Sequence, residues 1–120
     1  MTRVDGPATP SFDAAATLAR VAGDRDLLRE LVVLLCEDTP GRIARVTRTL
    51  ANGDLEGTQK AAHALKGAAT TFGAERAVAT ALRVERLAAD RDLQALPEAI
   101  EELDEEHTRL CRELTEFVGD

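Results

Sequence analysis

The segment "AHALKG", residues 62–67, places a histidine, a lysine and a glycine within about one turn of a predicted helix. The neutral imidazole of His63 is a competent nucleophile near neutral pH. Lys66, three residues further on, can reach the same patch and partly neutralise a phosphoryl group. Gly67 costs about 1 kcal/mol relative to alanine in a helix interior, and it removes a side chain that would wall off the ring. The three residues together predict a histidine that a phosphate-carrying macromolecule approaches.

The apolar residues of the same helix predict that His63 faces water. At about 100° per residue, His63 points roughly 140° away from their mean direction, and Gly67 lies roughly opposite to it. A solvent-facing histidine on a helix is usually inert, and it is the neighbouring Lys66 and Gly67 that favour a reactive one. The apolar seam consists of Leu55, Thr58, Ala62, Leu65, Ala69 and Phe72.

The second histidine, His107, lies on the apolar face, or seam, of its own predicted helix, unlike His63. We therefore predict a half-buried packing histidine that is held by a hydrogen bond. Asp104-x-x-His107 also matches half of a ferritin-type metal motif, but that site needs a second such motif and further inward glutamates. The intervals of this seam alternate between three and four residues, as in a packed helical bundle: Leu93, Leu96, Ile100, Leu103, His107, Leu110, Leu114 and Phe117.

The composition limits the class of protein. With 120 residues the chain is the size of one domain, and 44% hydrophobic residues are enough for a core. A net charge of −7 argues against nucleic acid or an anionic membrane surface as a partner. Neither a membrane-spanning run nor a signal-peptide pattern is visible. Cys36 and Cys111 form no metal-binding motif, and we predict reduced thiols in a cytoplasmic protein.

The order of helix signals predicts an all-α fold. Residues 1–10 form a flexible tail, and residues 11–120 form one domain. Ser11 is the expected N-cap of a short helix that carries Phe12, Ala15, Ala19 and Ala22 at helical spacing. Four longer helices follow, joined by tight loops, so neighbours should be antiparallel in an up-down four-helix bundle with the short helix as its cap. The longer helices are expected over about 25–51, 55–72, 74–89 and 93–117.

The chain resembles a known family, the histidine-containing phosphotransfer (HPt) domains of two-component phosphorelays. The resemblance extends from Ser11 to Phe117. It rests on "AHALKG" at 62–67 followed by "FGA" at 72–74, with support from "FD" at 12–13, "GD" at 23–24, Pro40, "GD" at 53–54 and "VE" at 84–85. It implies a phosphocarrier whose exposed histidine accepts a phosphoryl group from an aspartate of one receiver domain and passes it to an aspartate of another.

The resemblance also implies roles for individual residues. His63 is the phosphoacceptor, Lys66 an electrostatic helper and Gly67 the clearance for the receiver, while Glu85 orients the ring of His63. Ala68 departs from the family, many members of which have a serine there. We expect partner contacts at Phe12, Ala15, Leu18, Gln59, Lys60, Ala64, Gly67 and Thr70.

The chain has no phosphate-binding glycine loop of the ATPase or kinase kind. We therefore expect no cofactor and no enzymatic site of its own, with Mg²⁺ supplied by a partner receiver domain of a response regulator or hybrid kinase. We also expect a free-standing monomer. The alternative function is an adaptor that binds a receiver domain or a partner helix without being phosphorylated.

Overall fold

The computed structural model describes residues 10–119, which contain five helices and no strand. This confirms the predicted all-α class. The second helix has the predicted bounds, and the third and fourth differ from prediction by one residue at one end. The helices are α1 (Ala14–Arg20), α2 (Arg25–Ala51), α3 (Leu55–Thr71), α4 (Glu75–Ala89) and α5 (Leu96–Val118).

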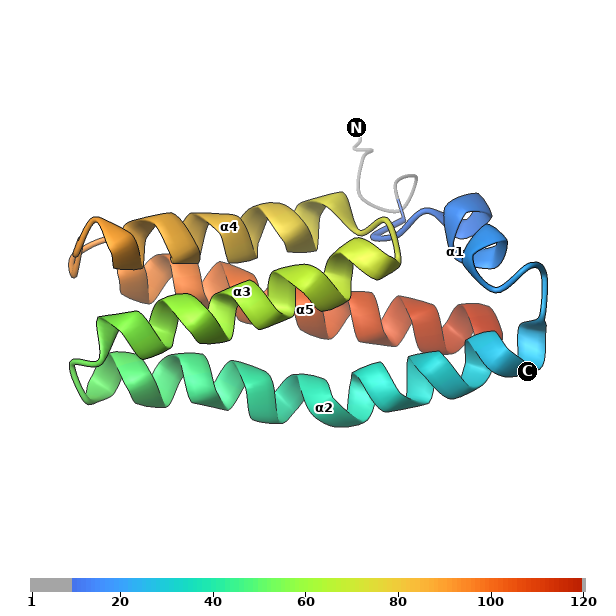
Figure 1. Ribbon diagram of the computed structural model, residues 1–120, viewed down its shortest axis with the longest axis horizontal. Helices are drawn as coiled ribbons and strands as arrows, with labels where there is room; N and C mark the ends of the chain where they lie inside the picture. The colour runs from blue at the N-terminus through green and yellow to red at the C-terminus, as the bar shows by residue number, and fades with distance from the viewer. Residues whose placement is uncertain (1–9, 120) are drawn as a thin grey trace, which may run out of the picture.

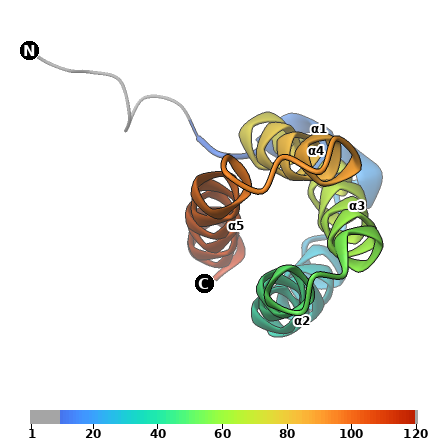
Figure 2. The same cartoon turned by 90° about the vertical axis from the view of Figure 1, so that its left-hand side faces the viewer.

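Helices α2 to α5 run alternately in opposite directions along the long axis of the molecule (Figure 1). Seen from one end, they follow one another around a common core in the order α2, α3, α4, α5 (Figure 2). Helix α3 packs most closely against α4 and then against α2, and α5 packs against α2 and α4. The short helix α1 lies at the end of the bundle where α3 ends (Figure 1).

Aspartates begin the first three helices by accepting a hydrogen bond from the backbone of the first turn. Asp13 accepts from Ala16 N, Asp24 from Leu27 N and Asp54 from Gly57 N. In the "GD" and "NGD" segments the glycine thus lies in the turn, and the aspartate that follows it caps the next helix. After α3 the chain reverses through Gly73, whose φ of 62° lies in the left-handed region that glycine adopts without strain.

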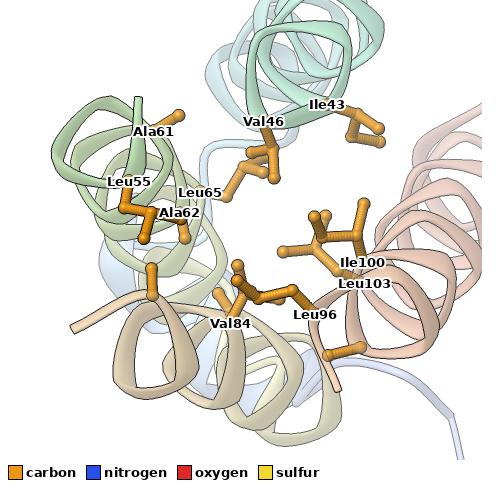
Figure 3. Packing of buried hydrophobic residues seen from close by; sticks show 13 residues of the cluster. Ile43, Val46, Leu55, Ala61, Ala62, Leu65, Val84, Leu96, Ile100 and Leu103 are labelled. Carbon is orange, nitrogen blue, oxygen red and sulfur yellow. The ribbon is translucent and has the colours of Figure 1, made fainter. Parts of the chain in front are cut away.

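The core consists of two neighbouring clusters of buried side chains. Leucine, valine and isoleucine from all four long helices fill the first cluster (Figure 3). Small side chains occupy much of the inner surface of α3 and α4. The buried alanines are Ala61, Ala62 and Ala69 on α3, and Ala77, Ala81 and Ala88 on α4. Such small residues let two helix backbones approach closely.

The prediction was wrong for the N-cap and for the buried face of helix α1. Its N-cap is Asp13 and not Ser11, whose backbone N and Oγ donate to Glu113 Oε1 of α5 over 2.8 and 2.7 Å. Its buried residue is Thr17, while Ala15 and Ala19 are exposed. The helix is held at its start by the bond from Asp13 N to Phe72 O. This tether to α3, and not the periodicity of α1, decides which face turns inward.

Helix α5 begins at Leu96, three residues later than predicted. Pro97 lies in its first turn, and the preceding residues form a turn in which Asp92 accepts from Ala95 N. Leu93, which was assigned to the seam, is therefore outside the helix and 60% exposed. The other residues of that seam are buried, apart from the half-buried Phe117.

The two cysteines meet at the contact between α2 and α5. Cys36 Sγ lies 3.7 Å from the Cys111 carbonyl oxygen, and both thiols are free and half-buried. Burial, together with the neighbouring Cys111 thiol, raises the pKa of Cys36 to about 12. Its thiol is therefore protonated and unreactive at neutral pH.

His107 is a packing residue, as predicted, and is more deeply buried than expected, with 3% of its surface exposed. Its Nε2 donates to Ala77 O of α4 over 3.1 Å. Burial lowers the pKa of His107 and outweighs the opposing effects of the bond to Ala77 and of the nearby Asp104. The folded state therefore holds this histidine neutral.

This burial predicts a loss of stability on mild acidification. The unfolded chain binds a proton at His107 near pH 6.5 and the folded chain only at lower pH, so the free energy of unfolding falls as the pH drops through 6.5. His107→Gln, which can still donate to Ala77 O, should cost about 1 kcal/mol at pH 7.5 and show a flatter profile between pH 7.5 and 5.5. Urea unfolding of both proteins measures this, and parallel profiles would contradict it.

Candidate functional site

His63, Glu85 and Lys66 form one connected cluster between α3 and α4. Nδ1 of His63 lies 2.9 Å from Glu85 Oε2, and Nζ of Lys66 lies 2.7 Å from Glu85 Oε1. The imidazole is 67% exposed, whereas the Lys66 and Glu85 side chains are only 25% and 16% exposed. One carboxylate from α4 thus holds both a ring and an ammonium from α3, and the ring projects furthest into solvent.

Glu85 is ionised in this arrangement. Burial by itself disfavours the charged form, but hydrogen bonds and charge from Lys66 and His63 outweigh it and lower the pKa of the carboxyl below its usual value. An ionised carboxylate can only accept hydrogen bonds. Nδ1 of His63 must therefore carry the proton that is shared with Glu85 Oε2.

The tautomer of His63 follows from this contact. In a neutral imidazole with a proton on Nδ1, the other nitrogen, Nε2, has a free lone pair. Within residues 10–119, no side chain or backbone group hydrogen-bonds Nε2. The reactive nitrogen is thus directed to solvent, and the ring is held from behind by a residue 22 positions away in the chain.

Gly67 lies one turn beyond His63 on the exposed surface of α3. A Cβ added to it would meet nothing within 4 Å. The glycine is therefore not required by packing against another part of the fold. The exposed residues Lys60, Ala64 and Thr70 and the half-buried Gln59 surround His63 on the same helix.

The predicted apolar rim from α1 is only partly exposed. Phe12 is only 8% exposed and packs edge-on against Phe117, with ring centroids 5.2 Å apart, so its assignment as an exposed docking residue was wrong. Ala15 is exposed and Leu18 half-buried. Their helix is tied to the C-terminal end of α3 by Thr17 Oγ1, which donates to Phe72 O. His63 lies about 12 Å back along α3, at 1.5 Å per residue.

The structure shows two features of the site that the sequence analysis did not identify. Lys66 is engaged by Glu85, so its ammonium is already paired with a carboxylate when another anion approaches. The arginines of "GRIARVTR", residues 41–48, line a groove next to α3. Their spacing of three residues on one helix of an acidic chain was the available signal for such a surface.

The ferritin-type alternative does not fit the geometry. Nε2 of His107 is used as a donor to Ala77 O, and Asp104 accepts from Thr108 Oγ1. No group of three or more histidine, cysteine or acidic side chains within residues 10–119 is arranged to hold a metal ion.

The fold and the site together define a helical bundle with one exposed, carboxylate-held histidine. A family model, described as "Hpt domain", matches residues 30–113. The chain belongs to the Hpt domain family. Since Hpt domains are phosphocarriers that act with receiver domains and kinases, this chain is a phosphotransfer carrier of two-component signalling.

A solved structure shows the same fold. It is the crystal structure of histidine-containing phosphotransfer protein B (HptB) from Pseudomonas aeruginosa PAO1. The TM-score is 0.84 at 21% sequence identity, over 92% of this chain and 96% of that chain. The comparison with curated proteins found no match. None of the helices in the described part of the chain has the length and hydropathy to cross a membrane.

The contact between Glu85 and His63 predicts the tautomer that solution NMR should detect. In the wild-type protein at neutral pH, the proton should reside on Nδ1 of His63. Glu85→Gln retains an oxygen that can accept from Nδ1–H and should keep this tautomer, whereas Glu85→Ala should shift the population toward Nε2–H. Nitrogen-15 chemical shifts of the ring distinguish the two forms.

The matched control is Glu102→Ala, which removes a glutamate that pairs with Arg83 on another part of the surface. It should leave the His63 shifts unchanged. A wild-type ring that is mainly Nε2–H would contradict the assigned role of Glu85.

Proposed function

We propose that His63 is the phosphoacceptor, that it takes a phosphoryl group from the aspartate of a receiver domain, and that it passes the group to the aspartate of another receiver. The observation that carries this proposal is the bare Nε2 of an exposed imidazole whose Nδ1–H is held by Glu85 over 2.9 Å. A nucleophile needs a free lone pair and an open approach, and in this cluster His63 has both.

The reaction is an in-line displacement at phosphorus. The Nε2 lone pair of His63 forms the N–P bond as the bond between phosphorus and the aspartyl oxygen breaks, and the aspartate leaves as a carboxylate. No proton has to leave Nε2, because the ring's proton is on Nδ1. The phosphorylated ring carries positive charge next to the ionised Glu85, which stabilises it. The reverse displacement on a second receiver regenerates the neutral imidazole.

Lys66 and Gly67 support the step in different ways. The Lys66 ammonium lies within one turn of His63 and can move from Glu85 to a phosphoryl oxygen once the ring carries charge. Gly67 leaves the space above the ring open, so that the face of a receiver can close over it. Phosphoryl transfer depends mainly on positioning and charge neutralisation, and Mg²⁺ held by the receiver supplies most of the charge neutralisation.

The proposal also includes the state of the carrier, which acts as a monomer in the cytoplasm.

Substitution of the two histidines tests the acceptor. With a phosphorylated receiver domain and Mg²⁺, the wild-type protein and His107→Gln should become labelled, and His63→Gln should not, because only His63 offers an exposed nitrogen. ATP alone should label none of them. The label should be acid-labile, as phosphohistidine is.

Label that persists in His63→Gln would overturn the assignment. Label from ATP alone, in a preparation free of kinase, would contradict the carrier function. A wild-type protein that binds receivers but is never labelled would support the adaptor alternative.

Substitutions at Gly67 should affect the stability of the fold and the rate of phosphoryl transfer differently. Because a Cβ at this position meets nothing, Gly67→Ala should raise the free energy of unfolding by up to about 1 kcal/mol with little effect on transfer. Gly67→Gln should melt no lower than the wild type, but its long side chain should slow transfer from a receiver. Labelling by the small reagent phosphoramidate should be unaffected. Unimpaired receiver-dependent transfer in Gly67→Gln would show that clearance is not its role.

A further inference from the structure

A groove of about 780 Å³ lies between α2 and α3, beside the surface that carries His63. The α2 wall belongs to the segment between Asp38 and Thr49, and the α3 wall includes Lys60, Ala61 and Ala64. Lys60 and Ala64 also flank His63 on α3. The groove and the surface around His63 are therefore continuous, on the side of the histidine away from Glu85.

The groove is open because its lining contains several residues with little or no side chain. Gly41 on α2 and Gly57, Ala61 and Ala64 on α3 all line it. A Cβ on Gly41 would meet nothing within 4 Å, so packing does not require this glycine. Gly57 differs, because its Cβ would collide with the capping carboxylate of Asp54. Gly41 thus marks free space at the α2 wall.

Four cationic side chains line the groove, in a chain whose net charge is −7. They are Arg42, Arg45, Arg48 and Lys60. Arg42 pairs with Asp38 over 3.8 Å and Lys60 with Glu56 over 3.7 Å.

The groove lining has two acidic residues, Asp38 and Asp54. Asp38 is the partner of Arg42, and Asp54 caps α3. Within residues 10–119, Arg45 and Arg48 have no acidic partner. Two uncompensated positive charges therefore project beside the phosphoacceptor surface of an acidic protein.

We propose that this groove binds a carboxylate-bearing segment of the receiver domain while the receiver's aspartate lies over His63, and that Arg45 and Arg48 determine which receivers are bound. This rests on the proposed function. The lining of the groove has four cationic side chains and two acidic ones, so the complementary occupant is a segment of the receiver that carries carboxylates. Complementary charge at the edge of an interface raises the association rate and rejects partners of the wrong sign.

The direct test reverses the two charges. Arg45→Glu/Arg48→Glu is compared with Arg20→Glu/Arg112→Glu, which changes the net charge equally at exposed sites on α1 and α5. Helix α5 lies across the bundle from α3 (Figure 2). Transfer from a phosphorylated receiver should be slower by about tenfold or more in the groove variant at low salt, and the difference should shrink as salt screens the charges. The control should transfer at nearly the wild-type rate.

Phosphoramidate labelling of His63 separates docking from chemistry. It should be equal in the wild type and in both variants. If the groove variant also loses phosphoramidate labelling, the arginines act on His63 itself and the docking proposal is wrong. Equal receiver-dependent rates in the two variants would overturn it as well. A wild-type protein that no receiver labels would overturn the proposed function itself.

A second variant fills the groove without changing its charge. Gly41→Gln should fold, because the position is open, and should slow receiver-dependent transfer, while Gly41→Ala should not. Inorganic phosphate, added at constant ionic strength, distinguishes a receiver site from a general anion site. Unchanged transfer supports receiver docking, and inhibition that disappears in Arg45→Glu/Arg48→Glu shows an anion site and overturns the proposal.

Discussion

The carboxylate of Glu85 is the contact on which the site depends. It joins α3 to α4 by accepting from His63 Nδ1 and pairing with Lys66 Nζ at the same time. The ring orientation, the free lone pair on Nε2 and the resting position of the lysine all follow from this one residue. The contact requires α3 and α4 to lie in one register, and the close packing of their small residues provides it.

Much of the fold could be predicted from the sequence, because the four long helices bury regular apolar seams and have strong start and stop signals. Helix α2 begins at the predicted residue since Asp24 caps it. Helix α1 could not be predicted in the same way, because seven residues carry too little periodicity to fix a face and its position is set by bonds to Phe72. Leu93 was misplaced because Pro97 delays the start of α5.

The exposure of His63 and the burial of His107 could be predicted from the spacing of apolar residues alone. His63 lies away from the apolar face of its helix, whereas His107 lies on the apolar face of its helix. The family resemblance suggested Glu85 as the partner of His63, and the two side chains are in contact. The angular position of a residue on its own helix does not show which side chains of two helices share one carboxylate. The pairing of Lys66 with Glu85 and the groove beside α2 depend on the distance and rotation between helices, which no single helix encodes.

The alanines that α3 and α4 bury also affect the thermodynamics of encounter with a partner. Alanine has no side-chain rotamers, so the contact that carries His63 and Glu85 has little conformational entropy to lose when a partner arrives. The platform is ordered before binding, and the loss of freedom on docking falls mainly on exposed long side chains such as Lys60 and the arginines of α2. A carrier that must bind one receiver, release it and bind the next benefits from a surface that returns unchanged after each encounter.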